Sequence, residues 1–85
     1  MKSLELVIKN KIGLHARPAA QFVKLAESFE SSVWITKDGM KVNGKSILSL
    51  LTLAAEEGCV ILLEVDGPDE QEAIDVLANV FKEED

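Results

Sequence analysis

The segment 60–65 constrains the fold most, because it is a near-continuous apolar run, Val-Ile-Leu-Leu-Glu-Val. Such a run is typical of an interior strand that is covered on at least one face. Near the start of the chain, Leu4, Leu6 and Ile8 alternate with other residues, which predicts a half-buried strand. The chain therefore needs a sheet with at least one strand lying between others.

Two more strands are predicted at 32–37 and 40–43, where residues that favour β-structure flank Asp38-Gly39. This dipeptide is a strong signal for a tight hairpin. Asn43-Gly44 breaks the second strand. The sheet is expected to be mostly antiparallel.

Three segments have helical periodicity instead. The first helix is predicted at residues 16–29, where the residues on one face are Phe22, Leu25, Ala26 and Phe29. The second is predicted from residue 47 to about 55, and Gly58 is expected to stop it. A last helix is predicted from an apolar stripe that consists of Ala73, Ile74, Leu77, Val80 and Phe81. Asp69 and Glu72 resemble a capping box for the last helix. The order βαββαβα predicts an α+β domain, a two-layer sandwich with the helices on one face of the sheet.

The 85 residues predict one domain spanning 1–85. The net charge of −6 argues against general nucleic-acid binding and against an anionic membrane surface. No apolar run approaches the ~20 residues that span a bilayer. A lone cysteine, Cys59, forms no internal disulfide and favours a reducing, cytoplasmic setting. Its apolar neighbours favour a buried, inert thiol.

The only histidine, His15, lies in Gly-Leu-His-Ala-Arg-Pro-Ala-Ala at 13–20, where a loop gives way to a helix. The free N–H groups and the dipole of a helix start favour a bound anion. Pro18 has no N–H, so the nearest backbone donors are those of Ala16 and Arg17. The planar guanidinium of Arg17 also suits the oxygens of a phosphoryl group.

A neutral imidazole can accept a phosphoryl group reversibly, because its unperturbed pKa of ~6.5 leaves a nucleophilic nitrogen at neutral pH. A histidine near a helix start is also commonly a cap or a solvated surface residue, and spacing alone leaves these interpretations about equal. An independent hydrolase or transferase is disfavoured, since no second acid–base group or nucleophile motif accompanies His15. No metal ion or cofactor is indicated.

The short helix after Ser46 forms a second candidate surface. The residues predicted to face the core are Leu50, Leu53 and Ala54. The residues predicted to stay exposed are Ile47, Leu48 and Leu51. An exposed apolar patch favours protein docking, whereas burial of both faces is the commoner fate of leucines. Ser46 is a natural N-cap, and its phosphorylation would place negative charge beside the patch.

These two segments together resemble the HPr family, the histidine-containing phosphocarrier proteins of the bacterial phosphoenolpyruvate-dependent sugar phosphotransferase system. The resemblance rests on the 13–20 motif and on Lys45-Ser46-Ile47 opening a short apolar helix, and it spans the whole chain in length and element order. It implies an open-faced β-sandwich and a carrier that is a substrate of enzymes but not itself an enzyme. Enzyme I, charged by phosphoenolpyruvate, would phosphorylate it, and IIA domains of sugar permeases would receive the group.

The same resemblance implies roles for individual residues. His15 would bear the phosphoryl group on Nδ1, and Arg17 would stabilise it. The implied partner-docking residues are Arg17, Lys24, Ile47, Leu48 and Leu51. Ser46 matches a serine that HPr kinase/phosphorylase modifies in many but not all members, with a catabolite-repression regulator as a further partner. A monomer without nucleic-acid binding or membrane insertion is expected.

Three positions depart from common family patterns. Ile12 replaces a polar residue that often helps to hold the phosphate, while Glu27 and Ser49 stand where some members have lysine, which makes the docking face less basic. Regulatory paralogues that lack the histidine are excluded by His15. The alternative to a sugar-transport relay is a regulatory binding module, either a nitrogen-branch phosphocarrier or an effector switched at Ser46.

Overall fold

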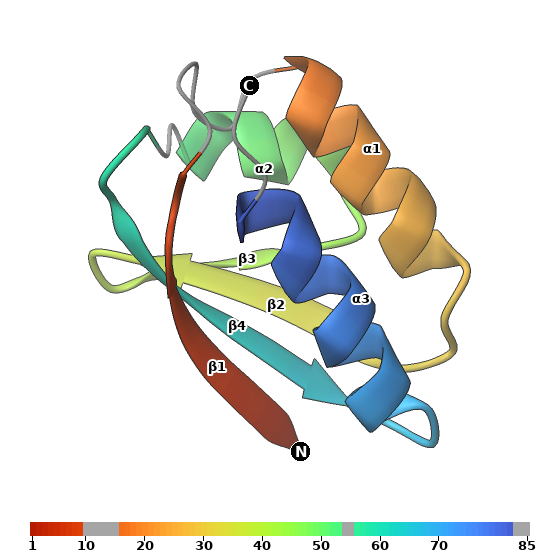
Figure 1. Ribbon diagram of the computed structural model, residues 1–85. Helices are drawn as coiled ribbons and strands as arrows, with labels where there is room; N and C mark the ends of the chain where they lie inside the picture. Colours follow the sequence, from red (N-terminus) through yellow and green to blue (C-terminus); the bar gives the residue numbers. More distant parts are fainter. Residues whose placement is uncertain (10–15, 54–55, 83–85) are drawn as a thin grey trace.

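The chain forms four strands and three helices in the predicted order βαββαβα, as seen in a computed structural model (Figure 1). The structure describes residues 1–9, 16–53 and 56–82, with only the backbone described at 16–18 and 82. The strands are β1 (Lys2–Val7), β2 (Ser32–Lys37), β3 (Met40–Asn43) and β4 (Val60–Asp66). The helices are α1 (Ala16–Glu27), α2 (Ile47–Leu53) and α3 (Glu70–Lys82).

The apolar segment β4 is an interior strand of the sheet, as predicted. The strand order is β1-β4-β2-β3, and every neighbouring pair is antiparallel. On the covered face, Leu63 pairs with Leu4 of β1 on one side and with Ile35 of β2 on the other. The Asp38-Gly39 hairpin is also confirmed, with φ of 50° and 81° at its two residues, the positive angles that a type I′ turn needs.

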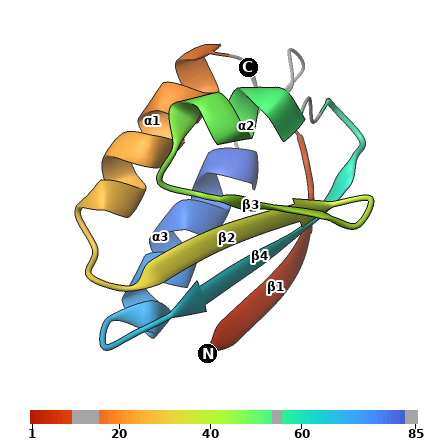
Figure 2. The same cartoon turned by 180° about the vertical axis from the view of Figure 1, so that it is seen from behind.

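All three helices lie on one face of the sheet, so the fold is an open-faced α+β sandwich (Figures 1 and 2). Phe22 of α1 and Phe81 of α3 meet beneath the helices with ring centroids 5.2 Å apart. The predicted stripe of α3 is buried throughout. In α1, Phe22 and Ala26 are buried but Leu25 and Phe29 are only partly buried, and the helix ends at Glu27 instead of residue 29.

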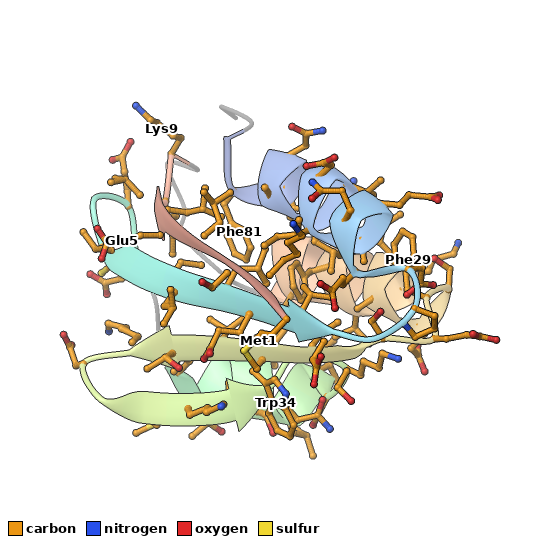
Figure 3. All side chains as sticks on the ribbon, turned by 90° about the horizontal axis from the view of Figure 1, so that it is seen from below. Met1, Glu5, Lys9, Phe29, Trp34 and Phe81 are labelled. Atoms are coloured by element: carbon orange, nitrogen blue, oxygen red, sulfur yellow. The ribbon has the colours of Figure 1, made fainter. Side chains whose placement is uncertain are left out.

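The other face of the sheet is not covered by helices. Val33 and Ile35 point into the core, so Trp34 between them lies on the open face, which Figure 3 views from below. The Lys41 ammonium lies 5.3 Å from the centroid of the Trp34 ring and 3.7 Å from Glu64 Oε1. Trp34 is thus a half-buried packing residue covered by a cation–π contact.

The prediction that Asp69 and Glu72 form a capping box for α3 is wrong. The Asp69 carboxylate does not turn back to its own helix but accepts the backbone N–H groups of Glu30 and Ser31. The acidic side chain that accepts a local backbone N–H at the start of α3 is Glu70, whose Oε1 accepts the N–H of Gly67 at 3.1 Å. The Asp69 carboxylate is therefore bound by N–H groups of the connection before β2 and not by those of α3.

Two smaller differences concern the burial of Leu4 and of Cys59. Leu6 and Ile8 are buried as expected, but Leu4 at the sheet edge is 39 % exposed. Cys59 is half-buried instead of buried, and its Sγ accepts the N–H of Glu56 at 3.4 Å. Gly58 has φ of 88°, the positive angle typical of a glycine that follows a helix, and donates its N–H to the carbonyl of Ile8. Its predicted role as the stop of the second helix stays a prediction, because residues 54–55 lie outside the described residues. Across the described residues, no helix is both long and apolar enough to cross a membrane.

Candidate functional site

Helix α1 begins at Ala16, the residue that follows His15 in the chain. Ala16 and Arg17 are its first two residues, so their N–H groups belong to the first turn, where no acceptor exists within the helix. Pro18 also lies in this first turn, where its missing N–H costs nothing. His15 and Ile12 lie outside the described residues, and so does the side chain of Arg17.

The packing of α1 and α3 fixes the chain on both sides of the segment 10–15. Ala19 and Phe22, which follow the first turn of α1, are fully buried. Before the segment, the N–H of Lys9 donates to the carbonyl of Phe81 at 2.9 Å, which joins the chain just after β1 to the last turn of α3 (both residues are labelled in Figure 3). The start of α1 is therefore held by the core and not by surface contacts alone.

Helix α2 has two apolar faces, and only one of them is buried. Leu50 and Leu53 are 0 % and 5 % exposed, whereas Leu48 is 74 % exposed and Ile47 and Leu51 are each 37 % exposed. This confirms the predicted division of the helix, apart from Ala54, which lies outside the described residues. We name Ile47, Leu48 and Leu51 the apolar patch. Figures 1 and 2 show α2 beside α1, toward the end of the molecule where α1 begins.

Ser46 caps α2, as the sequence predicted. Its Oγ accepts the N–H of Ser49 at 3.3 Å, and its carbonyl accepts the N–H of Leu50 at 3.1 Å. The Ser46 side chain is half-buried, and the next residues in the chain are Ile47 and Leu48 of the apolar patch. A charge added to this hydroxyl would therefore lie at the edge of the patch.

Charged residues lie on α1 and in the turn before α2. Lys24 and Glu27 are both exposed on α1, so a basic and an acidic side chain lie three residues apart on the surface of this helix. The half-buried Lys45 directs its Nζ away from solvent to the carbonyl of Phe29, at 2.8 Å. Sequence reasoning missed this contact, because the two residues are far apart in the chain and no local pattern links them.

The arrangement combines a helix start with an exposed apolar surface beside it. A helix start can hold an anion, and an apolar patch can bury against a protein partner. The described residues contain no cluster of three histidine, cysteine or acidic side chains able to hold a metal ion. The chemistry that such a surface supports is reception of an anionic group during contact with another protein.

Comparison with known proteins agrees with this description. The family described as "PTS HPr component phosphorylation site" matches residues 2–83. Phosphocarrier protein HPr of Neisseria meningitidis is 49 % identical over 80 residues, which cover 94 % of this chain and 88 % of that protein. HPr-like protein Crh of Bacillus subtilis is 46 % identical over 84 residues, 99 % of each.

The fold agrees as well. The crystal structure of HPr-C-His from Thermoanaerobacter tengcongensis superposes with a TM-score of 0.93 at 48 % identity, covering 96 % of this chain and 92 % of that one. Proteins of this family carry a phosphoryl group and are not enzymes. The chain belongs to the HPr family of phosphocarrier proteins.

Proposed function

We propose that this protein relays phosphoryl groups in a sugar phosphotransferase system, accepting them on His15 from enzyme I and passing them to IIA domains of sugar permeases. The observation that carries the proposal is the start of α1 directly after His15, beside an exposed apolar patch. One feature suits an anion and the other suits a protein partner, and a relay needs both. The protein would act as a monomer in the cytoplasm.

In the proposed transfer, the lone pair of His15 Nδ1 forms the new N–P bond as the bond from phosphorus to the donor breaks. The electron pair of that bond leaves with the donor, and in the onward step the same exchange occurs with the acceptor as nucleophile. The N–H groups of Ala16 and Arg17, with the Arg17 guanidinium, would stabilise the phosphoryl oxygens. Phosphoryl transfer needs mainly positioning and charge stabilisation, which a small carrier can provide.

The proposed docking face consists of the apolar patch with Arg17 and Lys24 at its border. Ile47, Leu48 and Leu51 offer apolar area that a partner can cover, while Leu50 and Leu53 anchor the same helix in the core. Glu27 and Ser49 reduce the positive charge of this face. Association with partners is therefore expected to depend more on apolar burial and less on electrostatic steering.

A second candidate function is regulation through Ser46. The relatives at 46–49 % identity include both phosphocarrier HPr and HPr-like Crh, and this mixture favours keeping the second candidate. HPr kinase/phosphorylase would phosphorylate Ser46, and a catabolite-repression regulator would bind the product. This candidate is supported by the position of Ser46 directly before Ile47, where an added charge would lie next to the proposed docking face.

The relay is tested by incubating the protein with phosphoenolpyruvate and purified enzyme I, from the sugar branch and from the nitrogen branch separately. The expected product is a phosphoprotein that is labile in acid and stable in base, formed faster with the sugar-branch enzyme. Arg17→Ala should remain folded at ambient temperature and accept the group more slowly. Equal labelling of His15→Ala would refute the proposal. Acid-stable phosphoserine without phosphohistidine in protein taken from cells would favour the regulatory function.

A further inference from the structure

Helix α2 is too short to be stable without contacts to the rest of the protein. It contains seven residues, and isolated helices of this length are unstable in water. Leu50 and Leu53 hold its inner face in the core. These two side chains fix how closely α2 packs on the core. The orientation of α2 relative to α1 also depends on the conformation of the turn that precedes α2.

The turn before α2 is fixed by a set of hydrogen bonds. Asn43 accepts the N–H of Lys45 on its side chain at 2.9 Å and the N–H of Ser46 on its carbonyl at 3.2 Å. Gly44 donates to the carbonyl of Val33 at 2.8 Å. A Cβ atom at Gly44 would lie 2.6 Å from Val33 Cγ1, so only glycine allows this close approach. These contacts tie the turn to the sheet.

One side chain ties the same turn to α1. The half-buried Lys45 donates its Nζ to the carbonyl of Phe29 at 2.8 Å, just beyond the end of α1 at Glu27. A positive charge near the carbonyl end of a helix is favourable, and a charge-assisted hydrogen bond is stronger than a neutral one. The contact therefore joins the far end of α1 to the beginning of α2.

We infer that Lys45 is a positioning residue for the docking face: its bond to the Phe29 carbonyl holds α2 against α1, so that the apolar patch lies at a fixed place relative to the start of α1. The inference rests on the proposed relay. Lys24 differs from Lys45 because its side chain is exposed and is available to a partner. The two lysines thus contribute to docking in different ways, one from within the protein and one by contact.

The test compares Lys45→Met, which keeps an unbranched apolar side chain one atom shorter but loses the donor, with Lys45→Arg, which keeps a donor. For transfer from enzyme I, Lys45→Met should raise KM by about three- to tenfold, with little change in kcat. This is less than the full effect of losing a charge-assisted hydrogen bond, because Leu50 and Leu53 still hold α2 in the core. Lys45→Arg should restore most of the loss. Lys41→Met is the matched control on the open face of the sheet and should leave KM unchanged.

Two further measurements separate positioning from direct contact. The effect of Lys45→Met should persist between about 0.05 and 0.5 M salt, whereas that of Lys24→Met should shrink as salt screens a contact with the partner. In the free protein, amide exchange in α2 should become faster in Lys45→Met and not in Lys41→Met. An unchanged KM in folded Lys45→Met, or an effect that salt abolishes, would overturn the inference. If no enzyme I labels the wild type, the relay fails, while exchange in α2 still decides the role of Lys45.

Discussion

Ser31 and Asp69 are joined by two hydrogen bonds although 38 residues separate them in the chain. The Ser31 N–H donates to Asp69 Oδ1 at 3.0 Å, and the Ser31 hydroxyl donates to the same oxygen. The second carboxylate oxygen accepts the N–H of Glu30 at 2.9 Å. Asp69, the residue before α3, thereby joins the connection between α1 and β2 to the start of that helix, at positions distant in the chain from the proposed phosphorylation site.

Replacing Ser31 with alanine should destabilise the protein without affecting its function. Ser31 is 1 % exposed, and its hydroxyl is one of the donors that satisfy the Asp69 carboxylate. Loss of one partly buried hydrogen bond to a charged acceptor should lower the free energy of unfolding by about 1.5 kcal/mol, the lower end of the usual range. Urea denaturation measures the change, and phosphotransfer from enzyme I at ambient temperature serves as the control. Ser32→Ala, at the exposed neighbouring position, should be close to neutral.

The pKa values of Asp69 and Glu70 make folding stability fall in acid. The Ser31 hydroxyl and the neighbouring N–H groups hold the pKa of Asp69 below its ordinary 3.8. The N–H of Gly67 holds that of Glu70 below its ordinary 4.5. Because both values are depressed in the folded state, the unfolded chain binds more protons, so their stabilisation is present above about pH 4.5 and is lost as pH falls through the folded values.

Urea midpoints measured from neutral pH down to about pH 2 should therefore fall most steeply below about pH 4. Asp69→Asn should be less stable than the wild type at neutral pH and should show a shallower fall in acid, because it no longer titrates. Parallel curves for the two proteins would show that the Asp69 contacts do not stabilise the folded state.

Local signals account for most of what the sequence predicted correctly. The end of β2 at Lys37 and the beginning of β3 at Met40 follow from the Asp38-Gly39 dipeptide between them, because a type I′ turn requires positive φ at both residues. The Ser46 cap and the division of α2 into two faces also depend only on residues within one or two turns. The interior position of β4 follows from its apolar composition.

Long-range contacts account for the wrong partner predicted for Asp69 and for the missed partner of Lys45. The side chain of Asp69 was expected to cap its own helix, but donors 38 and 39 residues away hold it in the fold. The contact of Lys45 with Phe29 likewise depends on how α1 ends beside the turn before α2. Periodicity within one element cannot indicate which polar groups another element will bring near, so these partners required the three-dimensional structure.

Alanine variants of Leu48 and Leu50 should distinguish an effect on docking from an effect on the free energy of unfolding. Leu48→Ala should change the free energy of unfolding by less than about 0.5 kcal/mol, because that side chain is already 74 % exposed. It should raise KM for transfer from enzyme I, since it removes apolar area from the proposed docking face. Leu50→Ala, with a fully buried side chain, should cost about 3 kcal/mol of stability. A Leu48→Ala variant with unchanged KM would place the docking face elsewhere.

Ser46 should respond differently to alanine and to aspartate. Ser46→Ala removes the oxygen that accepts the Ser49 N–H and should lower stability by about 1 kcal/mol, with little effect on docking. Ser46→Asp keeps an oxygen able to cap α2, so its stability should stay near that of the wild type. Its negative charge lies beside Ile47 and Leu48, so binding of enzyme I should weaken because the charge must be desolvated in the complex. Calorimetric titration of both variants with enzyme I checks the contrast, and equal affinity of Ser46→Asp and the wild type would mean that the start of α2 lies outside the docking face.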